Sequence, residues 1–74
     1  MEEVLYTVAQ VSKIMKTSHN YVYELIRLGL LPALKLRHLK VRKEALNEFL
    51  RRFEGKDLSD LSDIKPLKEG GENE

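Results

Sequence analysis

The sequence predicts a mainly α-helical domain with one small β-hairpin, in the order helix, turn, helix, hairpin, helix. Apolar residues recur at helical spacing in three stretches, at residues 8–15, 18–29 and 43–53. A short turn around Lys16 and Thr17 separates the first two stretches, and two short helices joined in this way form a helix-turn-helix. Residues 34–37 alternate between apolar and polar side chains, which favours a strand. A chain of 74 residues holds one such domain.

The first helix is expected at residues 8–15, and two polar side chains mark its start. Thr7 is a candidate N-cap, and Gln10 stands three residues later, as in a capping box. Its apolar face comprises Val8, Val11, Ile14 and Met15. Ahead of this helix, residues 4–6 are apolar and partly β-prone, and they fit either a minor strand or a lead-in that packs on the core.

The second helix is expected between Ser18 and Gly29, and both of its ends are marked. The Ser18 hydroxyl can accept a hydrogen bond from the first turn, and Gly29 supplies a left-handed residue at the end. Its apolar face comprises Val22, Leu25, Ile26 and Gly29, and a separate polar stripe comprises Asn20, Tyr23, Glu24 and Arg27. A major groove admits such a helix, and its position in the order makes it the recognition helix. The alternative is an ordinary core helix with a solvated polar face.

Pro32 prevents the second helix from continuing, and a hairpin is expected after it. Leu34 and Leu36 fall on one side of its first strand, residues 39–41 form the returning strand, and the tip near Arg37 is basic. The third helix, at residues 43–53, presents Ala45, Leu46, Phe49, Leu50 and Phe53 on one face. We expect the core to consist of the apolar faces of the three helices and the inner face of the hairpin.

Charge divides the chain into two parts. Residues 1–53 hold 10 basic and 5 acidic side chains, whereas residues 54–74 hold 3 basic and 7 acidic ones. A basic folded part points to a polyanionic partner. We therefore expect a DNA-binding domain at residues 1–53 and an acidic, disordered and mobile tail at residues 54–74. The spacing of Leu58, Leu61 and Ile64 leaves open whether one turn of helix in this tail docks on the domain.

Several classes of function are excluded by what the sequence lacks. It has no cysteine, and therefore no disulfide framework, thiolate metal site or cysteine nucleophile. It has no run of about 18 apolar residues, and its acidic start is unlike a secretory signal. It also shows no nucleophile paired with a base, no glycine-rich phosphate loop and no set of metal ligands. We expect a cytoplasmic protein that is not an enzyme and has no cofactor, membrane partner or small-molecule substrate.

The complete order resembles the small winged helix-turn-helix proteins of the excisionase-like group, relatives of the MerR-type DNA-binding domain. The resemblance spans about residues 5–53 and rests on residues 6–8, 18–27, 29–33, 40–46 and 49–50. It implies that the second helix enters the major groove and that the hairpin is a wing on the backbone or minor groove. The implied function is that of a recombination directionality factor or a small transcription regulator of a phage or mobile element. Double-stranded DNA is then the partner, with an integrase or another regulator as a candidate second partner.

The polar stripe and the resemblance together give the expected DNA contacts. They are Ser18, His19, Asn20, Tyr23 and Arg27 on the second helix, and Arg37, His38 and Lys40 on the wing. Asn20 can bind adenine, and Arg27 can bind guanine or, near the far end of the helix, phosphate. The alternatives are solvation for Asn20 and His38, and packing against the wing for Tyr23. A different class of function also stays open, namely a protein-interaction adaptor that uses this fold to bind a recombinase or regulator.

Two positions depart from the family's pattern. The wing usually carries glycine where Arg37 stands, and glycine is the residue that tolerates positive φ. Either the wing turns differently in this chain, or Arg37 is strained. Glu24 lies on the expected DNA face, where it can accept from cytosine, pair with Arg27 or repel phosphates. Tyr21, which lies between the two faces of the helix, is expected to be half-buried.

Overall fold

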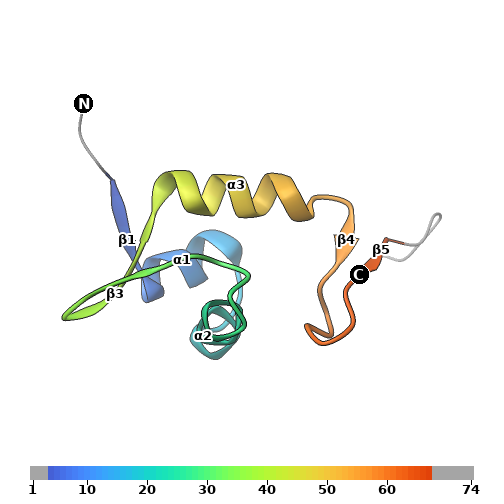
Figure 1. Cartoon of the computed structure of the whole chain (residues 1–74), viewed down its shortest axis with the longest axis horizontal. Helices are drawn as coiled ribbons and strands as arrows, with labels where there is room; N and C mark the ends of the chain where they lie inside the picture. Colours follow the sequence, from blue (N-terminus) through green and yellow to red (C-terminus); the bar gives the residue numbers. More distant parts are fainter. Residues whose placement is uncertain (1–3, 68–74) are drawn as a thin grey trace.

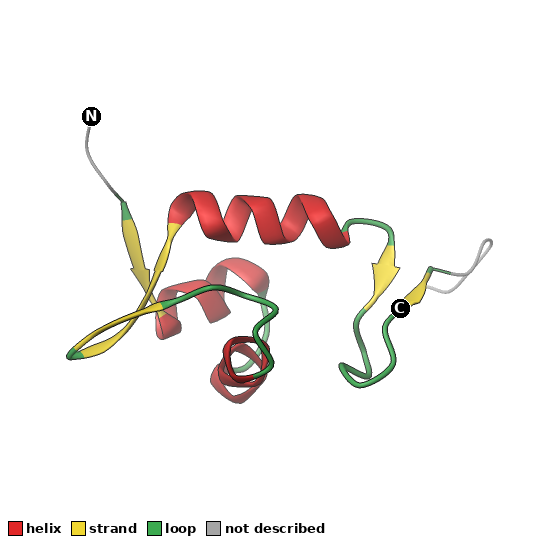
Figure 2. Ribbon diagram, viewed as in Figure 1, coloured by secondary structure: helices red, strands yellow, loops and turns green. Residues whose placement is uncertain are grey.

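A computed structural model of the chain describes residues 4–67, and these contain three helices and five short strands (Figure 1). In chain order the elements are β1 (Leu5–Thr7), α1 (Val8–Met15), α2 (His19–Arg27), β2 (Leu34–Leu36), β3 (His38–Arg42), α3 (Lys43–Phe53), β4 (Lys56–Asp57) and β5 (Lys65–Pro66). The three helices and the hairpin follow the predicted order. The wing, formed by β2 and β3, lies at one end of the molecule and β4 and β5 lie at the other, with α3 between them (Figure 2).

Local side-chain chemistry sets the start and the end of α1. Thr7 Oγ1 accepts from the backbone N–H of Gln10 at 3.1 Å, and the Thr7 N–H donates to Gln10 Oε1 at 2.9 Å, which confirms the capping box. Lys16 ends the helix in the left-handed conformation, with a φ of 57°. The N–H of Thr17 then donates back to the carbonyl of Ser12 at 2.9 Å. The chain thereby enters α2 after three residues.

Both predicted caps of α2 are present. Ser18 Oγ accepts from the N–H of Tyr21 at 3.1 Å. At the other end Gly29 has a φ of 78°, and the N–H of Leu30 donates to the carbonyl of Leu25 at 2.9 Å. This bond, together with the one from the Gly29 N–H to the Ile26 carbonyl at 3.0 Å, forms a Schellman motif. The recognition helix is therefore fixed in length by its own sequence.

The lead-in at the start of the chain is a strand. A three-stranded antiparallel sheet has the order β1-β3-β2, with Tyr6 opposite Val41 and Leu36 opposite His38. Helix α3 begins directly after β3, and the N–H of Lys43 donates to the carbonyl of Val4 at 3.0 Å. The central strand of the sheet therefore connects the wing to α3.

The core forms where the three helices meet β3. Its buried residues come from all three helices, from the loop after α2 and from β3, and they are Val8, Val11, Val22, Leu25, Leu31, Val41, Leu46 and Phe49. Three residues assigned to the core from sequence spacing are instead largely exposed, namely Ile14 (46%), Leu36 (51%) and Leu50 (42%). The buried face of α1 runs through Val8, Val11 and Ser12, so Ile14 falls beyond its edge. So small a domain cannot cover every apolar position of its helices.

The first part of the acidic segment after α3 docks on the domain, which the sequence left open. Strands β4 and β5 pair with each other, and the loop between them packs Leu58 and Leu61 against the core. The Tyr21 hydroxyl donates to the carbonyl of Leu58 at 2.7 Å, and Tyr21 is half-buried as expected. We call residues 56–66 the strap. The packing of Leu58 and Leu61 answers the question that the sequence left open, whether part of the tail docks on the domain. The last residues of the tail, 68–74, lie outside the described part of the chain.

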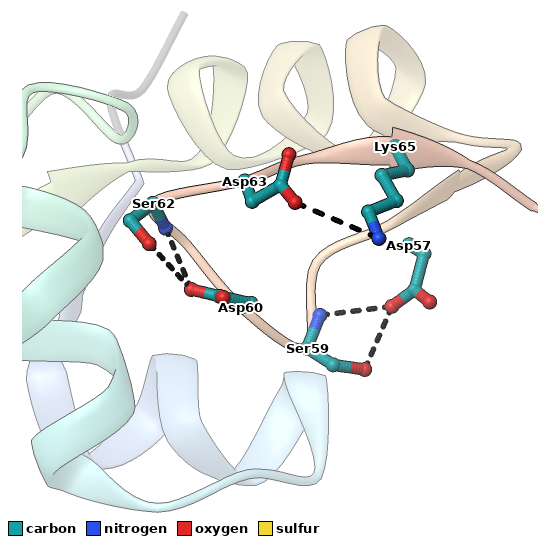
Figure 3. A network of polar contacts seen from close by, with 6 residues as sticks. All are labelled: Asp57, Ser59, Asp60, Ser62, Asp63 and Lys65. Atoms are coloured by element: carbon teal, nitrogen blue, oxygen red, sulfur yellow. Dashed lines mark hydrogen bonds and ion pairs between the residues drawn. The ribbon is translucent and has the colours of Figure 1, made fainter.

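Serine–aspartate contacts give the strap its local shape (Figure 3). Asp57 Oδ1 accepts from the N–H and the hydroxyl of Ser59 at 2.9 and 2.7 Å. Asp60 Oδ1 accepts from the same two groups of Ser62 at 3.0 and 2.7 Å. Hydrogen bonds that an aspartate carboxylate accepts from the backbone N–H two residues later stabilise turns. Composition alone could not show that the two apolar residues of this loop reach the core.

The bond between Tyr21 and Leu58 predicts a measurable contribution to stability. Tyr21→Phe removes the donor and leaves the half-buried carbonyl without it, so we expect a loss of about 0.5–1.5 kcal/mol. For a domain of this size the melting temperature then falls by roughly 4–8 °C per kcal/mol. Tyr23→Phe is the matched control, because Tyr23 is 48% exposed on the same helix. Equal melting temperatures for the two variants would show that the strap is not held through Tyr21.

Candidate nucleic-acid interface

An open groove of about 400 Å³ lies between the recognition helix and the wing. Helix α2 contributes His19 and Tyr23 to it, and residues 7–9 at the start of α1 form a further part of its wall. The wing contributes Lys35, Arg37, His38, Leu39 and Lys40. The antiparallel pairing of Thr7 with Lys40 places the start of α1 beside the wing. Three elements far apart in the sequence thus meet at one concave surface, which we call the basic groove.

The charge of the basic groove has one sign. Lys35, Arg37 and Lys40 are cationic, and none of the described residues that line the groove is acidic. His19, His38 and the exposed Tyr23 add hydrogen-bonding groups. A concave surface with cations, donors and no carboxylate concentrates field lines and attracts a polyanion.

Arg37 alone forms the tip of the wing. Its neighbours Leu36 and His38 are paired with each other, so a single residue makes the turn between β2 and β3. Its φ is 77°, a left-handed value that costs an L-residue roughly 1–2 kcal/mol. The positive φ supports the second possibility raised by the missing glycine, a strained Arg37. The strained residue is thus the one that carries a cationic side chain at the tip of the wing.

The structure brings together five of the eight residues predicted to contact DNA. His19, Tyr23, Arg37, His38 and Lys40 line the basic groove, and all but Lys40 are classed as exposed. Tyr23 lies beside the wing residues but keeps 48% of its surface exposed, so it is not buried by packing against them. These five residues come from α2, from the turn at the tip of the wing and from β3.

Three of the predicted residues lie outside the basic groove. The Ser18 hydroxyl caps α2, and Asn20 is exposed in the first turn of the helix. Arg27 lies nearer the strap, in a second groove that α2 shares with it. Arg27 lies one helical turn after Tyr23 on α2, so its contact with DNA requires the duplex to extend along α2 beyond the basic groove.

Glu24 pairs with Arg27, which is one of the three roles that the sequence left open. The Arg27 guanidinium donates to Glu24 Oε2, and the two side chains are 67% and 43% exposed for Arg27 and Glu24. The hydrogen bond from Arg27 lowers the pKa of Glu24, and the same bond raises the pKa of Arg27. The pair is thus charged at neutral pH and contributes no net charge to the surface of α2.

Sequence reasoning missed Lys35 and the start of α1 as parts of the groove. A signal for Lys35 was present, because alternation along a strand puts it on the same side of β2 as Arg37. No local signal existed for residues 7–9. Their place depends on the pairing of β1 with β3, which joins segments more than thirty residues apart.

The described residues offer two further findings about the range of functions. Among residues 4–67 no helix has the length and apolar character that crossing a membrane requires, and α3 has only 11 residues. The same part of the chain contains no group of three or more His, Cys, Asp or Glu side chains placed to hold a metal ion.

Comparison with known proteins places the groove within a recognised domain. A family model described as a helix-turn-helix domain matches residues 5–54, which confirms the resemblance seen in the sequence. Comparisons with curated proteins and with solved structures gave no significant match. The matched range begins at β1, ends at the C-cap of α3 and contains every residue of the basic groove. Because the match takes in more than half of the sequence, the chain belongs to the helix-turn-helix domain family.

Proposed function

We propose that residues 1–53 bind double-stranded DNA sequence-specifically, with α2 in the major groove and the wing on the adjoining backbone. The observation that carries this proposal is the basic groove, which gathers Lys35, Arg37 and Lys40 beside the recognition helix without a carboxylate. Membership of the helix-turn-helix family supports the same partner, because the second helix of this motif reads the major groove.

The first half of α2 supplies the base contacts in this proposal. The N-terminal residues of a recognition helix reach base edges, and Asn20 is exposed in that turn. Its amide can donate to and accept from adenine at the same time. His19 and Tyr23 face the basic groove and are placed for the sugar-phosphate backbone or a base edge. Ser18 accepts from the N–H of Tyr21, and its hydroxyl proton can still be donated to a phosphate.

The wing grips the backbone rather than reading bases. Arg37 stands at its tip, His38 follows, and Lys40 lies half-buried nearer the sheet. Contacts of Lys and Arg with phosphate fix the orientation of a protein on the duplex but carry no sequence information directly. Arg27 is assigned to phosphate as well, and it must leave Glu24 to make that contact.

Within DNA binding, we propose a role as an excisionase-like directionality factor or as a small transcription regulator of a phage or mobile element. The resemblance to the excisionase-like group supports both roles. They differ in the second partner, because only the first requires an integrase. Cooperative binding of purified integrase and this protein to one recombination site, and an integrase gene beside this one, would support the first role. Independent binding to a promoter would support the second.

Binding to duplex DNA should weaken steeply as salt rises. If the cations of the basic groove and the helix neutralise about four phosphates, the logarithm of the association constant should fall against the logarithm of salt concentration with a slope near −3.6. Fluorescence anisotropy of a labelled duplex at several salt concentrations measures that slope. A flat dependence, or no duplex recovered in a site selection, would contradict DNA binding.

Variants of α2 should separate base reading from phosphate binding. Asn20→Ala should relax sequence preference at one base pair and cost roughly 1–3 kcal/mol of discrimination there. Arg27→Gln should weaken all duplexes more evenly if Arg27 holds phosphate. Glu24→Gln is the matched control, since it breaks the same ion pair and leaves the cation in place. Uniform losses from Asn20→Ala and Arg27→Gln alike would mean that Asn20 reads no base.

Arg37→Gly should change stability and DNA affinity in opposite directions. Glycine adopts a positive φ without strain, and this gain should offset the conformational entropy cost of glycine, about 0.5–1 kcal/mol. The free protein should therefore be equally or more stable. Loss of the tip cation should lower DNA affinity and reduce the salt slope by roughly 0.9.

Lys16→Gly provides the matched control for this change. Lys16 is the other non-glycine residue with positive φ among those described, and it does not line the basic groove. The Lys16→Gly protein should be equally or more stable for the same reason, and it should lose less DNA affinity than the Arg37→Gly protein. Thermal melting and anisotropy measure both effects. A less stable Arg37→Gly protein with unchanged DNA affinity would contradict both the strain and the wing contact.

A further inference from the structure

Helix α2 separates two grooves of different character. The basic groove lies on its wing side, and a groove of about 460 Å³ lies on the other side, between the helix and the strap. We call the second one the strap groove. Helix α2 and the residue after it contribute Tyr21, Glu24, Arg27 and Leu28, and the strap contributes Ser59, Asp60, Leu61 and Ser62.

One hydrogen bond to α2 and apolar packing on the core hold the strap in place, and further bonds close it on itself. The Tyr21 hydroxyl donates to the Leu58 carbonyl, and Leu58 and Leu61 pack against the core. Burial raises the pKa of the Tyr21 hydroxyl, and the charge of Asp57 raises it further, so the donor proton is retained at neutral pH. Pairing of β4 with β5 closes the segment, and the N–H of Leu67 donates to the carbonyl of Gly55 at 2.9 Å. The strap therefore keeps its acidic groups in a fixed place beside the recognition helix.

Asp60 gives the strap groove its charge. Both hydrogen bonds from Ser62, the hydroxyl first and then the backbone N–H, lower the pKa of Asp60 and keep the carboxylate ionised (Figure 3). Among the described residues that line this groove Arg27 is the only cation, and it is paired with Glu24. No described residue that lines the strap groove offsets the charge of Asp60, although Lys65 outside the groove also helps to lower its pKa. Asp63 on the same strap instead forms an ion pair with Lys65 at 3.5 Å and does not line the groove.

We propose that Asp60 is a specificity-determining residue, which repels phosphates from the strap flank of α2 and confines the duplex to the flank of the basic groove. This inference rests on the proposed DNA binding. Non-specific complexes form through phosphate contacts alone and can use any cationic surface. An anion fixed at one flank of α2 destabilises those poses that lean toward it and leaves the pose on the basic groove least affected. Discrimination then comes from a repulsive element as well as from attractive contacts.

Charge changes at Asp60 test this inference. Asp60→Asn keeps a side-chain oxygen that can accept from Ser62, and Asp60→Lys reverses the charge. Asp63→Asn is the matched control, because it removes the same charge from the same strap. Each protein is titrated with a 20-base-pair duplex of random sequence and with the best duplex from a site selection. The salt concentration is about 10 mM, where the screening length is about 30 Å. Melting temperatures verify that each variant is folded, and Asp60→Asn suffices if the lysine variant is not.

We expect a gain in affinity that is larger for the random duplex than for the selected one. One charge roughly 10 Å from a phosphate in water changes affinity about twofold, so Asp60→Asn should bind the random duplex about twofold more tightly, and Asp60→Lys about fourfold. The selected duplex should gain less, so the ratio of the two affinities falls. Asp63→Asn should have a smaller effect on that ratio.

The outcomes distinguish this inference from the function beneath it. If the wild-type protein binds DNA and the Asp60 variants bind the random duplex no more tightly than it does, Asp60 does not repel the duplex from the strap flank. The same conclusion follows if Asp63→Asn has as large an effect as Asp60→Asn, because net charge alone then accounts for the gain. If neither the wild-type protein nor any variant binds either duplex, the proposed DNA binding itself is wrong.

Discussion

The pairing of β1 with β3 is the constraint on which the rest of the structure depends. Thr7 is at once the last residue of β1, the partner of Lys40 and the N-cap of α1. One residue therefore ties the helix-turn-helix to the wing, and the orientation of each relative to the other follows. The burial of Val41 on β3 against Val8 and Val22 acts together with this pairing to hold the two halves of the basic groove in place. The same strand β3 continues directly into α3, so the helix that covers the core is aligned by the sheet as well.

Packing and charge are distributed differently over this small molecule. Among residues 4–67, eight apolar residues form the buried core, and they come from all three helices, β3 and the loop after α2. A domain of this size buries only a limited fraction of its surface. Additional contacts such as those of the strap therefore contribute a larger share of its stability. Charge instead varies along the surface of α2, with cations on the wing side and Asp60 on the strap side. Helix α2 thus lies between a groove lined by three cations and a groove lined by Asp60 and the Glu24–Arg27 pair.

Local signals in the sequence were sufficient for the helices, their caps and the position of the wing. Thr7, Ser18 and Gly29 act where the sequence places them, because capping depends only on residues a few positions apart. The arginine at position 37, where the family usually has glycine, was also visible in the sequence. Its positive φ explains why glycine is the usual residue there. Non-local contacts were not visible. The exposure of Ile14 and Leu50 depends on where neighbouring elements end, and the docking of Leu58 depends on a hydroxyl 37 residues earlier. Five of the eight expected contact residues meet in one groove, whereas Arg27 lines the strap groove instead.

The central claim is that α2 and the wing form one continuous surface for duplex DNA. The most direct measurement is a titration of the ¹⁵N-labelled protein with a duplex, followed by the backbone amide chemical shifts in NMR spectra. The account predicts that the largest changes occur together at residues 18–23 and 35–40, on both sides of the basic groove, with much smaller changes at residues 57–63 of the strap. Changes concentrated on the strap or on the exposed face of α3, with residues 35–40 unaffected, would contradict it.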